Sequence, residues 1–415
     1  MRTKLAFTSA ALGSITAGLL AFACSSDSTS STPANPEAGT ETGGAGTGGK
    51  GTGGKGTGGA GSGGKAAGGA GGTGTGGKGT GGAGTGGTQT TDGGTELSVC
   101  GGKTGQAQID CGEYIVKHID ACADCHSPTD PVTHGPDATK FLQGNATLFD
   151  IAPADSATGS IPTPNLTLLK GQGWTAADIK DAVLNGKRTA ARGGGMFPIM
   201  PYFTFHNMAA ADADAIAAYI LSLPAAGNPA PGRQPLPAPL DPALFPIPAT
   251  PATAIPKTTL PSTDAHFADA ERGQHLAAQL APCMECHTEH TPQGSLDTTK
   301  LFAGGEKFQV GAPFNTVTSL NITPANNGIK SWKPADVQKL ILTGVDTQGQ
   351  RICPPMPAGP FGAFGGMDPN DALSIGYYLT TIPGIENPVD GGTIGMCVLP
   401  PLPKDAGASK DAAHD

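Results

Sequence analysis

The chain has 415 residues and a formal net charge of −9 at pH 7, and only 5% of its residues are aromatic. The negative charge argues against a nucleic acid as partner and against charge-driven binding to an anionic membrane surface. The length allows two modest domains, but so few aromatic side chains predict poor hydrophobic cores unless another apolar group fills them.

Residues 1–23 are predicted to be a signal peptide. Arg2 and Lys4 form a basic start, and an apolar run from Leu5 to Ala23 ends in a small-residue cleavage context. Because Cys24 follows the cut, we expect a bacterial lipoprotein attached to a membrane through a lipid on Cys24, in the periplasm or at the cell surface. Ordinary cleavage that leaves a soluble protein is the alternative. An uncleaved membrane anchor is disfavoured by the Ser, Thr and Gly within the run.

Residues 24–98 are rich in Ser and Thr and then in Gly, with near-repeats of Thr-Gly-Gly-Lys-Gly. Such a segment has no apolar core to build and much backbone entropy to lose, which predicts a disordered tether. A phosphate-binding loop is disfavoured because no helix with Lys-Ser or Lys-Thr follows the glycines. Residues 404–415 are likewise predicted to be a disordered tail.

Two Cys-x-x-Cys-His pentads are the most specific motifs in the chain. They are Cys122-Ala-Asp-Cys125-His126 and Cys283-Met-Glu-Cys286-His287. In this attachment signature of c-type haem, two thiols on one side of a helical turn form thioethers with the vinyl groups, and the histidine ligates the iron. We therefore predict two haem c groups, attached through Cys122, Cys125, Cys283 and Cys286 and ligated by His126 and His287.

The surroundings of the two pentads match in the same order, which indicates a duplicated domain. The matching segments are Gly112–Ile115 with Gly273–Leu276, Phe141–Gly144 with Phe302–Gly305, Asn165–Thr167 with Asn321–Thr323, Trp174 with Trp332, and Tyr219–Pro224 with Tyr378–Pro383. We assign residues 99–224 to the first domain and 262–403 to the second. Residues 225–261 are rich in proline, which fixes φ and removes amide donors, and this predicts an extended, semi-rigid linker.

Each unit is predicted to consist of three helices joined by loops, an all-α fold. In the first unit we expect helices from about Cys111 into the pentad, from after Trp174 to near Gly186, and over about Ala210–Leu223. Thr175 and Asp178 give the second helix a capping-box pattern. In the second unit, Asp368-Pro369 is predicted to open the closing helix, with proline at its first position.

Met200 and Met356, each followed by proline at matching places, are the candidate second axial ligands of the iron. A thioether is a soft, neutral ligand that favours ferrous iron and raises the reduction potential. Core packing is the ordinary role of a methionine. In the first unit, Met196 and His206 are rival ligands.

Other residues near these motifs have simpler interpretations. Core packing is expected for Met208 and Met367. A solvated surface is expected for Asp124, Glu285 and Glu289, and polar surface or capping roles for His118, His134, His266, His275 and His290. We expect Asn165, Asn321, Trp174 and Trp332 to lie near haem propionates. For the two tryptophans, core packing is the alternative.

The four remaining cysteines are an even number in an oxidising compartment, which predicts disulfides. We expect Cys100 to pair with Cys111 and Cys353 with Cys397. Pairing between the units, or four free thiols, is the alternative. A bridge from Cys353 to Cys397 would hold the C-terminal segment against the loop that carries Met356.

Two other chemistries fit parts of the pattern. Cys283 and Cys286, with His287 or His290, have the ligand types of a small zinc site. The first unit has Thr129 where the second has His290, and the repeat therefore argues against zinc. A redox Cys-x-x-Cys disulfide is the other alternative, but it needs neither the adjacent histidine nor a matching methionine.

Taken together, these motifs resemble those of the cytochrome c subunits of bacterial membrane-bound alcohol, gluconate and aldehyde dehydrogenases, over about residues 110–224 and 270–383. The resemblance implies two tandem class I cytochrome c domains, with iron ligated by His126 and Met200 in one and by His287 and Met356 in the other. The chain departs from that family in having two haem units where three are common, in its glycine-rich start, and in Met-Pro-Ala at the second methionine.

The function expected from this resemblance is a dihaem c-type cytochrome that transfers single electrons between a redox protein donor and acceptor, with a dehydrogenase as one candidate partner. The chain is thus expected to be an electron carrier or an electron-transfer subunit rather than a stand-alone enzyme. The alternative is a dihaem oxidoreductase, peroxidase-like or thiosulfate-oxidising, in which one iron keeps an open position for substrate.

Overall fold

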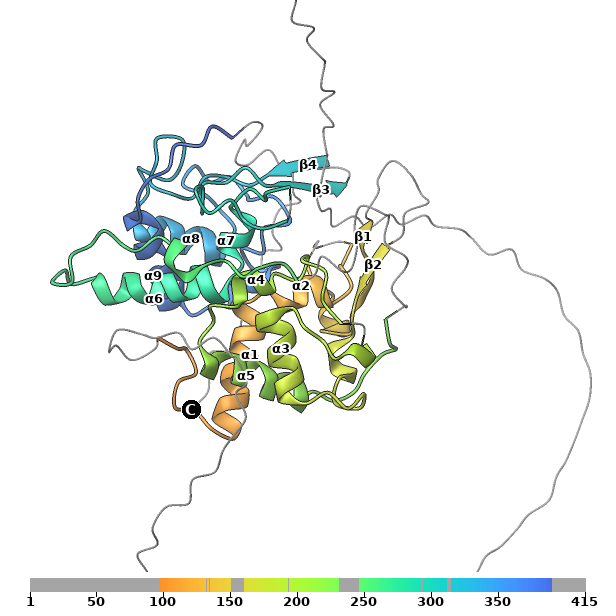
Figure 1. Ribbon diagram of the computed structural model, residues 1–415. Coiled ribbons are helices and arrows are strands. Elements are labelled where there is room, and N and C mark those ends of the chain that lie inside the picture. Colours follow the sequence, from red (N-terminus) through yellow and green to blue (C-terminus); the bar gives the residue numbers. More distant parts are fainter. Residues whose placement is uncertain are drawn as a thin grey trace, which may run out of the picture. The chain divides into compact units, whose positions relative to one another are not determined.

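The computed structural model describes residues 97–131, 133, 135–150, 160–192, 194–230, 246–292, 294–311 and 315–389 (Figure 1). We refer to 97–230 as the first half and to 246–389 as the second half. The predicted signal peptide, Cys24, the tail and all but the last two residues of the tether lie outside the described residues.

The first half contains helices and one hairpin. Its elements are α1 (Gln106–His118), α2 (Cys122–His126), η1 (Ala138–Lys140), β1 (Asn145–Asp150), β2 (Ser160–Thr163), η2 (Leu166–Leu168), α3 (Ala176–Asn185), η3 (Ala190–Arg192), α4 (Tyr202–Phe205) and α5 (Ala210–Ser222). The pentad forms α2, between the long helix α1 and the hairpin.

The second half repeats this order. Its elements are η5 (Ala252–Ala254), α6 (Phe267–His275), the π-helical η6 (Leu276–Leu280), α7 (Cys283–Cys286), β3 (Lys307–Gly311), β4 (Asn315–Thr318), α8 (Pro334–Thr343), η7 (Ala363–Gly366) and α9 (Pro369–Thr381). The second pentad contributes α7, which follows the long helix as α2 does in the first half.

The predicted ends of two helices are confirmed. At the start of α3 the side chains and amides of Thr175 and Asp178 bond reciprocally, and the helix ends at Gly186, which has a φ of 60°. This left-handed conformation favours glycine. At the start of α9 the carboxylate of Asp368 accepts a hydrogen bond from the amide of Asn370, and Pro369 is the first helical residue.

The predicted course of the first helix is wrong in two respects. The helix α1 begins at Gln106, before Cys111, and it ends at His118 instead of running into the pentad. Ala121 lies between α1 and α2 with a φ of 53°, a left-handed conformation that a right-handed helix cannot pass through. The pentad therefore forms a separate short helix.

Two antiparallel hairpins correct the expectation of an all-α fold, although helices predominate. The strands β1 and β2 pair in the first half and β3 and β4 in the second, with Phe308 opposite Val317. A two-stranded hairpin is marginally stable alone. These hairpins are stabilised by packing against the helices around them rather than by their own sequences. The strand pattern in those sequences is therefore weak.

The long helices of each half pack closely against the closing helix of the same half, α1 against α5 and α6 against α9 (Figure 1). A Cβ atom on Gly112 would lie 2.0 Å from the carbonyl oxygen of Ala215, and one on Gly273 would lie 1.9 Å from that of Ser374. Both distances are far below van der Waals contact. The two matching glycines of the repeat are therefore required for this close approach.

The hydrogen bonds show that one segment of the repeat aligns differently from the predicted match. The amide of Leu142 donates to Ser127 Oγ at 2.9 Å, and the amide of Phe302 donates to Thr288 Oγ1 at 3.0 Å. Leu142 and Phe302 also share a positive φ, at 57° and 64°. Phe302 thus corresponds to Leu142, and the predicted match of Phe302 with Phe141 is wrong by one residue.

The described part of the proline-rich segment contacts both halves. The amide of Thr250 donates to the carbonyl of Phe203 at 2.8 Å, and the carbonyl of Pro256 accepts from the hydroxyl of Tyr378 at 2.7 Å. Apart from η5, residues 246–261 form no helix or strand. This agrees with the extended conformation that proline favours.

Two cysteine predictions fall within the described residues. Cys100 and Cys111 form a disulfide, as predicted, which ties the segment before α1 to that helix. Cys353 is disulfide-bonded. Its predicted partner, Cys397, lies outside the described residues, and that pairing stays a prediction. Across the described part of the chain, no helix has the length and the apolar character needed to cross a membrane.

Candidate functional site

The two pentads present their thiols from short helices. No disulfide joins Cys122 to Cys125 or Cys283 to Cys286. The structure therefore gives no support to the redox-disulfide alternative, and all four thiols keep the form that thioether attachment requires.

Each pentad histidine is held by one ring nitrogen. The carbonyl of Pro164 accepts a hydrogen bond from His126 Nδ1 at 3.0 Å, and the carbonyl of Leu320 accepts one from His287 Nδ1 at 2.7 Å. A carbonyl only accepts, and Nδ1 must therefore carry the proton, which leaves Nε2 with its lone pair for a metal. Burial lowers the pKa of both histidines, which favours the neutral imidazole that iron binds.

The two accepting carbonyls immediately precede the Asn-x-Thr motifs, which fix them in place. Asn165 Oδ1 accepts from the amide of Thr167 at 3.0 Å, and its Nδ2 donates to the carbonyl of Ala226 at 2.8 Å. Asn321 makes the same turn, and its Nδ2 donates to the carbonyl of Ile385 at 2.7 Å. These amides bond to the backbone and so support the histidines indirectly. Their predicted position near haem propionates stays a prediction.

The tryptophans have the packing role that was the alternative prediction. The guanidinium of Arg192 lies 4.7 Å from the centre of the Trp174 ring, a cation–π distance. Trp332 packs against the hydrophobic core from a partly buried position.

The candidate methionine ligands lie half-buried in loops. Met200 and Met356 pack against the hydrophobic core, and the carbonyl of Met200 accepts from the amide of Tyr202 at 2.7 Å, where α4 begins. Met208 and Met367 are 5% and 3% exposed, which agrees with the predicted packing role. Ligation of iron by Met200 and Met356 stays a prediction.

The rival ligands occupy different surroundings. Met196 is half-buried against the core, as Met200 is. His206 is exposed, and the carbonyl of Leu184 accepts a hydrogen bond from its Nδ1 at 3.0 Å. This contact holds the His206 ring at the surface beside α3.

The two pentads lie within electrostatic reach of each other. The pKa of Cys286 is raised first by burial and then by Glu285, Cys283, Cys125 and Glu306. Cys125 belongs to the first pentad and Cys286 to the second. Because such interactions weaken with distance, the two attachment sites must adjoin.

Direct contacts join the second pentad to α4 of the first half. Thr204 Oγ1 donates to Glu285 Oε2 at 3.3 Å, and the ring of Phe203 meets that of His290 edge to face at 6.2 Å. The loop that carries Met200 leads directly into α4. The candidate ligand loop of one site thus continues into contacts with the pentad of the other.

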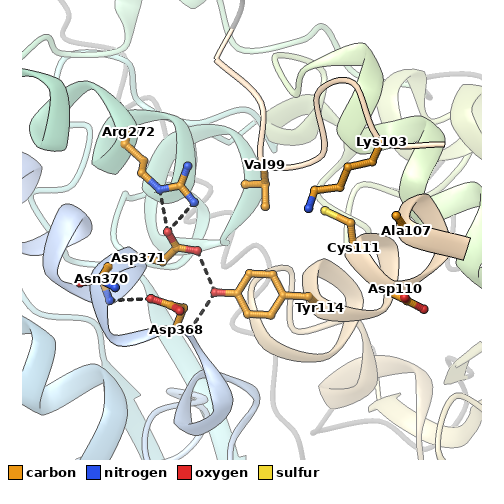
Figure 2. Close-up of a pocket in the computed structure, with 10 residues that line it drawn as sticks. All are labelled: Val99, Lys103, Ala107, Asp110, Cys111, Tyr114, Arg272, Asp368, Asn370 and Asp371. Atoms are coloured by element: carbon orange, nitrogen blue, oxygen red, sulfur yellow. Dashed lines mark hydrogen bonds and ion pairs between the residues drawn. The ribbon is translucent and has the colours of Figure 1, made fainter. Parts of the chain in front are cut away.

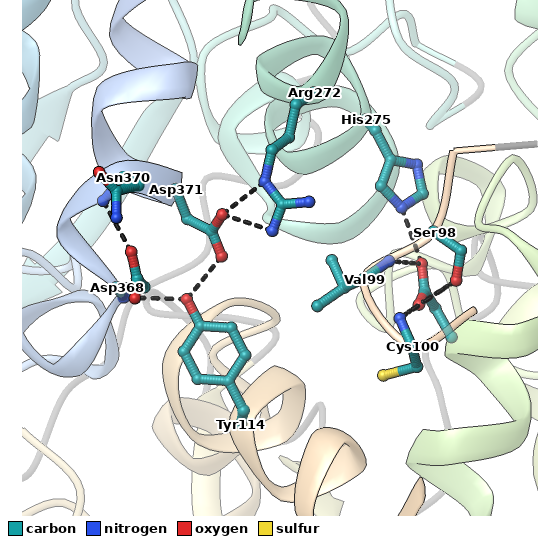
Figure 3. A network of polar contacts seen from close by, with 10 residues as sticks. Ser98, Val99, Cys100, Tyr114, Arg272, His275, Asp368, Asn370 and Asp371 are labelled. Atoms are coloured by element: carbon teal, nitrogen blue, oxygen red, sulfur yellow. Dashed lines mark hydrogen bonds and ion pairs between the residues drawn. The ribbon is translucent and has the colours of Figure 1, made fainter. Parts of the chain in front are cut away.

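A second set of contacts between the halves is arranged with pseudo-twofold symmetry. The hydroxyl of Tyr114 on α1 donates to Asp371 Oδ2 on α9 at 2.8 Å, and His275 Nε2 on α6 lies 2.7 Å from Asp212 Oδ2 on α5 (Figure 3). Each aspartate is the third residue of its closing helix. Each aromatic residue lies two positions after the glycine of its long helix, and the interface is therefore of the isologous kind.

A cavity of about 690 Å³ lies at this interface (Figure 2). Tyr114 borders it from α1 and Arg272 from α6, where the guanidinium binds Asp371 Oδ1 at 2.6 Å. No pentad residue or candidate methionine lines this cavity. It is therefore distinct from the attachment sites.

Two histidines predicted to be polar surface or capping residues instead lie in polar clusters, His275 buried and His290 partly buried. His275 is only 4% exposed and faces Asp212. His290 lies between Glu285 and Glu306. Both predictions were wrong because the partners come from distant segments.

The other histidines fit their predicted roles where they are described. His118 Nδ1 donates to the carbonyl of Ala363 at 3.2 Å, and the exposed ring of His266 stacks on Tyr377. His134 lies outside the described residues.

Two of the three acidic residues near the pentads are less exposed than predicted. Asp124 is partly buried, its buried Oδ2 lacks a hydrogen-bond partner, and burial raises its pKa to about 7. The side chain of Glu285 is 15% exposed. Glu289 is 40% exposed and pairs with Lys300, as expected of a solvated surface.

Glu306 and the two interface aspartates, Asp212 and Asp371, were not predicted from the sequence. No local pattern marks Glu306, which lies 16 residues from its partner His290. Asp212 and Asp371 do have a signal, because the same residue type occurs at the same position of the two closing helices. The zinc alternative gains no support, since among the described residues no cluster of three or more His, Cys, Asp or Glu is arranged to hold a metal ion.

These sites have the features of c-type cytochromes: paired thiols on a short helix, and a following histidine with Nε2 free for iron. No family model matches the chain. The fructose dehydrogenase cytochrome subunit of Gluconobacter japonicus is 29% identical over 285 residues, which cover 66% of this chain and 52% of that protein. A diheme cytochrome c-type protein of Cereibacter sphaeroides is 25% identical over 292 residues, which cover 69% of this chain and 88% of that protein.

The chain thus resembles dihaem cytochromes c and, among them, the cytochrome subunits of bacterial dehydrogenases. It spans about half the length of the fructose dehydrogenase subunit. The similarity supports an electron-transfer role in general.

Proposed function

We propose that this protein is a dihaem c-type cytochrome that transfers single electrons between redox partners in the periplasm or at the cell surface. The observation that carries the proposal is the matched pair of pentad histidines. In both halves Nδ1 donates to a backbone carbonyl, at 3.0 Å and 2.7 Å, and Nε2 is left for iron. The same arrangement at both pentads favours two haem groups.

The residues present fit haem c. Cys122, Cys125, His126 and Met200 would hold one group, and Cys283, Cys286, His287 and Met356 the other. When bound, haem supplies the one-electron couple of ferric and ferrous iron. The protein fixes the imidazole orientation through Pro164 and Leu320, buries His126 and partly buries His287, and holds the two attachment sites next to each other.

We further propose that the two halves are tandem class I cytochrome c domains. The same elements recur in the same order, with the same close packing of long and closing helices. The hairpins β1–β2 and β3–β4 recur as well, as expected if one ancestral domain was duplicated.

A dehydrogenase is the electron donor that we propose. One relative is named as the cytochrome subunit of a fructose dehydrogenase. Because the matched region covers only 52% of that protein, its sugar substrate is not carried over to this chain. We propose further that a lipid on Cys24 attaches the protein to a membrane.

Visible spectroscopy of the purified protein tests this function. A haem count of two per chain, sharp bands in the reduced state, and a weak near-infrared band from thioether-to-iron charge transfer are expected. A matched control changes Cys122 and Cys125 to Ala and should retain one haem, on the second pentad. A high-spin signal from one haem would favour the open-site oxidoreductase instead. A colourless protein would contradict haem binding altogether.

A further inference from the structure

A charged cluster beside the second pentad has no equivalent in the first half. Glu285 Oε1 lies 2.9 Å from His290 Nε2, and Glu306 Oε2 lies 3.0 Å from His290 Nδ1. The side chains of the three residues are 25% exposed or less. Carboxylate oxygens accept, and both ring nitrogens must therefore carry protons, which makes the ring an imidazolium.

The electrostatics of the cluster agree with this geometry. Burial alone lowers the pKa of His290, but Glu285 and Glu306 outweigh it and raise the pKa to about 10. The cluster therefore has one positive and two negative charges at neutral pH. Both carboxylates also act on Cys286, an attachment thiol of the second pentad.

Glu285 has an acidic counterpart in the first half, Asp124, but the residues that correspond to His290 and Glu306 carry no charge. Thr129 stands three residues after His126, as His290 does after His287, and both residues form isolated bridges with the following loop. The amide of Asn145 donates to Thr163 Oγ1 at 2.9 Å, as the amide of Glu306 donates to Ser319 Oγ at 3.0 Å. Between Phe302 and Glu306 the second half has one residue more than the first half has between Leu142 and Asn145. The duplicated domain thus differs between its halves at the positions of His290 and Glu306.

We propose that His290 is a positioning residue that, clamped between Glu285 and Glu306, sets the reduction potential of the haem on the second pentad apart from that on the first. This inference rests on the proposed function. A nearby positive charge favours the ferrous state and raises the potential, whereas a carboxylate lowers it. Partial burial keeps these charges from being screened by salt. The difference between the potentials gives electron transfer between the adjoining sites its direction.

Substitutions that introduce the corresponding residues of the first half test the proposal, because each predicts the direction in which the reduction potential shifts. H290T changes the cluster charge from −1 to −2 and should lower the potential of the second haem. The expected shift is about tenfold in the equilibrium between ferrous and ferric iron, or about 59 mV for one electron. E306N changes the charge to 0 and should raise that potential by a similar amount. The double variant restores −1 and should return the potential close to its original value.

Potentiometric titration followed by visible spectra resolves the two haems. Lys300→Gln is the matched control, because it removes a positive charge from an exposed pair with Glu289, where salt screens it, and it should shift neither potential. If H290T fails to take up both haems, E306N still carries the test, since it keeps the imidazole.

Three results would overturn the inference while leaving the proposed function intact. They are shifts of the reduction potential in the same direction in H290T and E306N, equal shifts for both haems, and no shift at all. A wild-type protein that binds no haem would overturn both. Opposite shifts confined to one haem, with the near-infrared band retained, support a charge effect rather than a loss of structure.

Discussion

His275 Nε2 lies 2.7 Å from Asp212 Oδ2, and this contact joins α6 of the second half to α5 of the first. Both side chains are almost completely buried, with 4% and 0% exposed. Asp212 also accepts hydrogen bonds from Ser98 and from the amide of Cys100. The Asp212 carboxylate therefore joins three parts of the chain: the segment before α1, helix α5 of the first half and helix α6 of the second.

His275→Ala should lower the free energy of unfolding by about 3 kcal/mol, because a buried carboxylate loses its imidazole hydrogen-bond partner. Chemical denaturation of the haem-loaded protein measures this loss. Tyr114→Phe, at the corresponding position of the first half, is the control. It should cost only about 1 kcal/mol, since Asp371 keeps its bond to Arg272. Equal losses of unfolding free energy in the two variants would contradict the stabilising role assigned to His275 as the partner of Asp212.

Acid should weaken the same contact. Burial raises the pKa of Asp212, but the bonds from His275, Ser98 and Cys100 outweigh it, and the pKa is lower than usual. A carboxylate with a lower pKa in the folded state stabilises the fold above its unfolded pKa of about 3.9, and this stability is lost as pH falls through the folded value. The free energy of unfolding of the wild type should fall more steeply below about pH 4 than that of Asp212→Asn. Parallel pH profiles would contradict the assignment.

Met200→Ala and Met356→Ala should each convert one haem and leave the other low-spin, with about half of the near-infrared band lost and the potential of the affected haem lowered. Visible and near-infrared spectra measure both effects. Met196→Ala and His206→Ala are the controls for the first site. An unchanged spectrum in Met200→Ala would mean that Met196 or His206 is the ligand.

Cys24→Ala should release the protein from membranes without changing its haem content, because the residue lies outside both halves. Fractionation of cells followed by haem staining measures the membrane-bound share. Stable attachment requires more than one acyl chain, as a lipoprotein anchor supplies. The same membrane-bound share in variant and wild type would show that another element attaches the protein.

Peptide mapping without reduction should recover Cys353 linked to Cys397. Cys353 is disulfide-bonded in the structure, three residues before Met356. Closing a loop of this length stabilises the fold by roughly 3–4 kcal/mol in a chain-entropy model. We also expect Cys353→Ser with Cys397→Ser to weaken the near-infrared band of one haem only. A peptide that links Cys353 to Cys100 or Cys111 would contradict the pairing.

The structure could be predicted from the sequence wherever it depends on residues that are close together in the chain. The start of α3 at Thr175 and the proline at the first position of α9 were predicted correctly, because capping involves residues within one turn. The break at Ala121 and the hairpins were not predicted, since each depends on packing against distant elements. The pentads themselves were evident because their spacing is dictated by the chemistry of attachment.

The polar clusters were beyond prediction from sequence for the same reason. His275 and Asp212 are 63 residues apart, and Tyr114 and Asp371 are 257 apart. Nothing in either local sequence marks a partner at such a distance. The repeat does place the two aspartates at equal positions, but it does not show that each faces the opposite half.

The pseudo-twofold contacts have diverged, and this makes the order of the halves specific. Asp371 meets a tyrosine hydroxyl and Arg272, whereas Asp212 meets an imidazole. A chain assembled from two copies of the first half would place Tyr114 opposite Asp212 at both contacts and would supply no cation to either carboxylate. After gene duplication, such divergence makes each half complementary only to the other half. A second copy of either half can therefore no longer replace its partner.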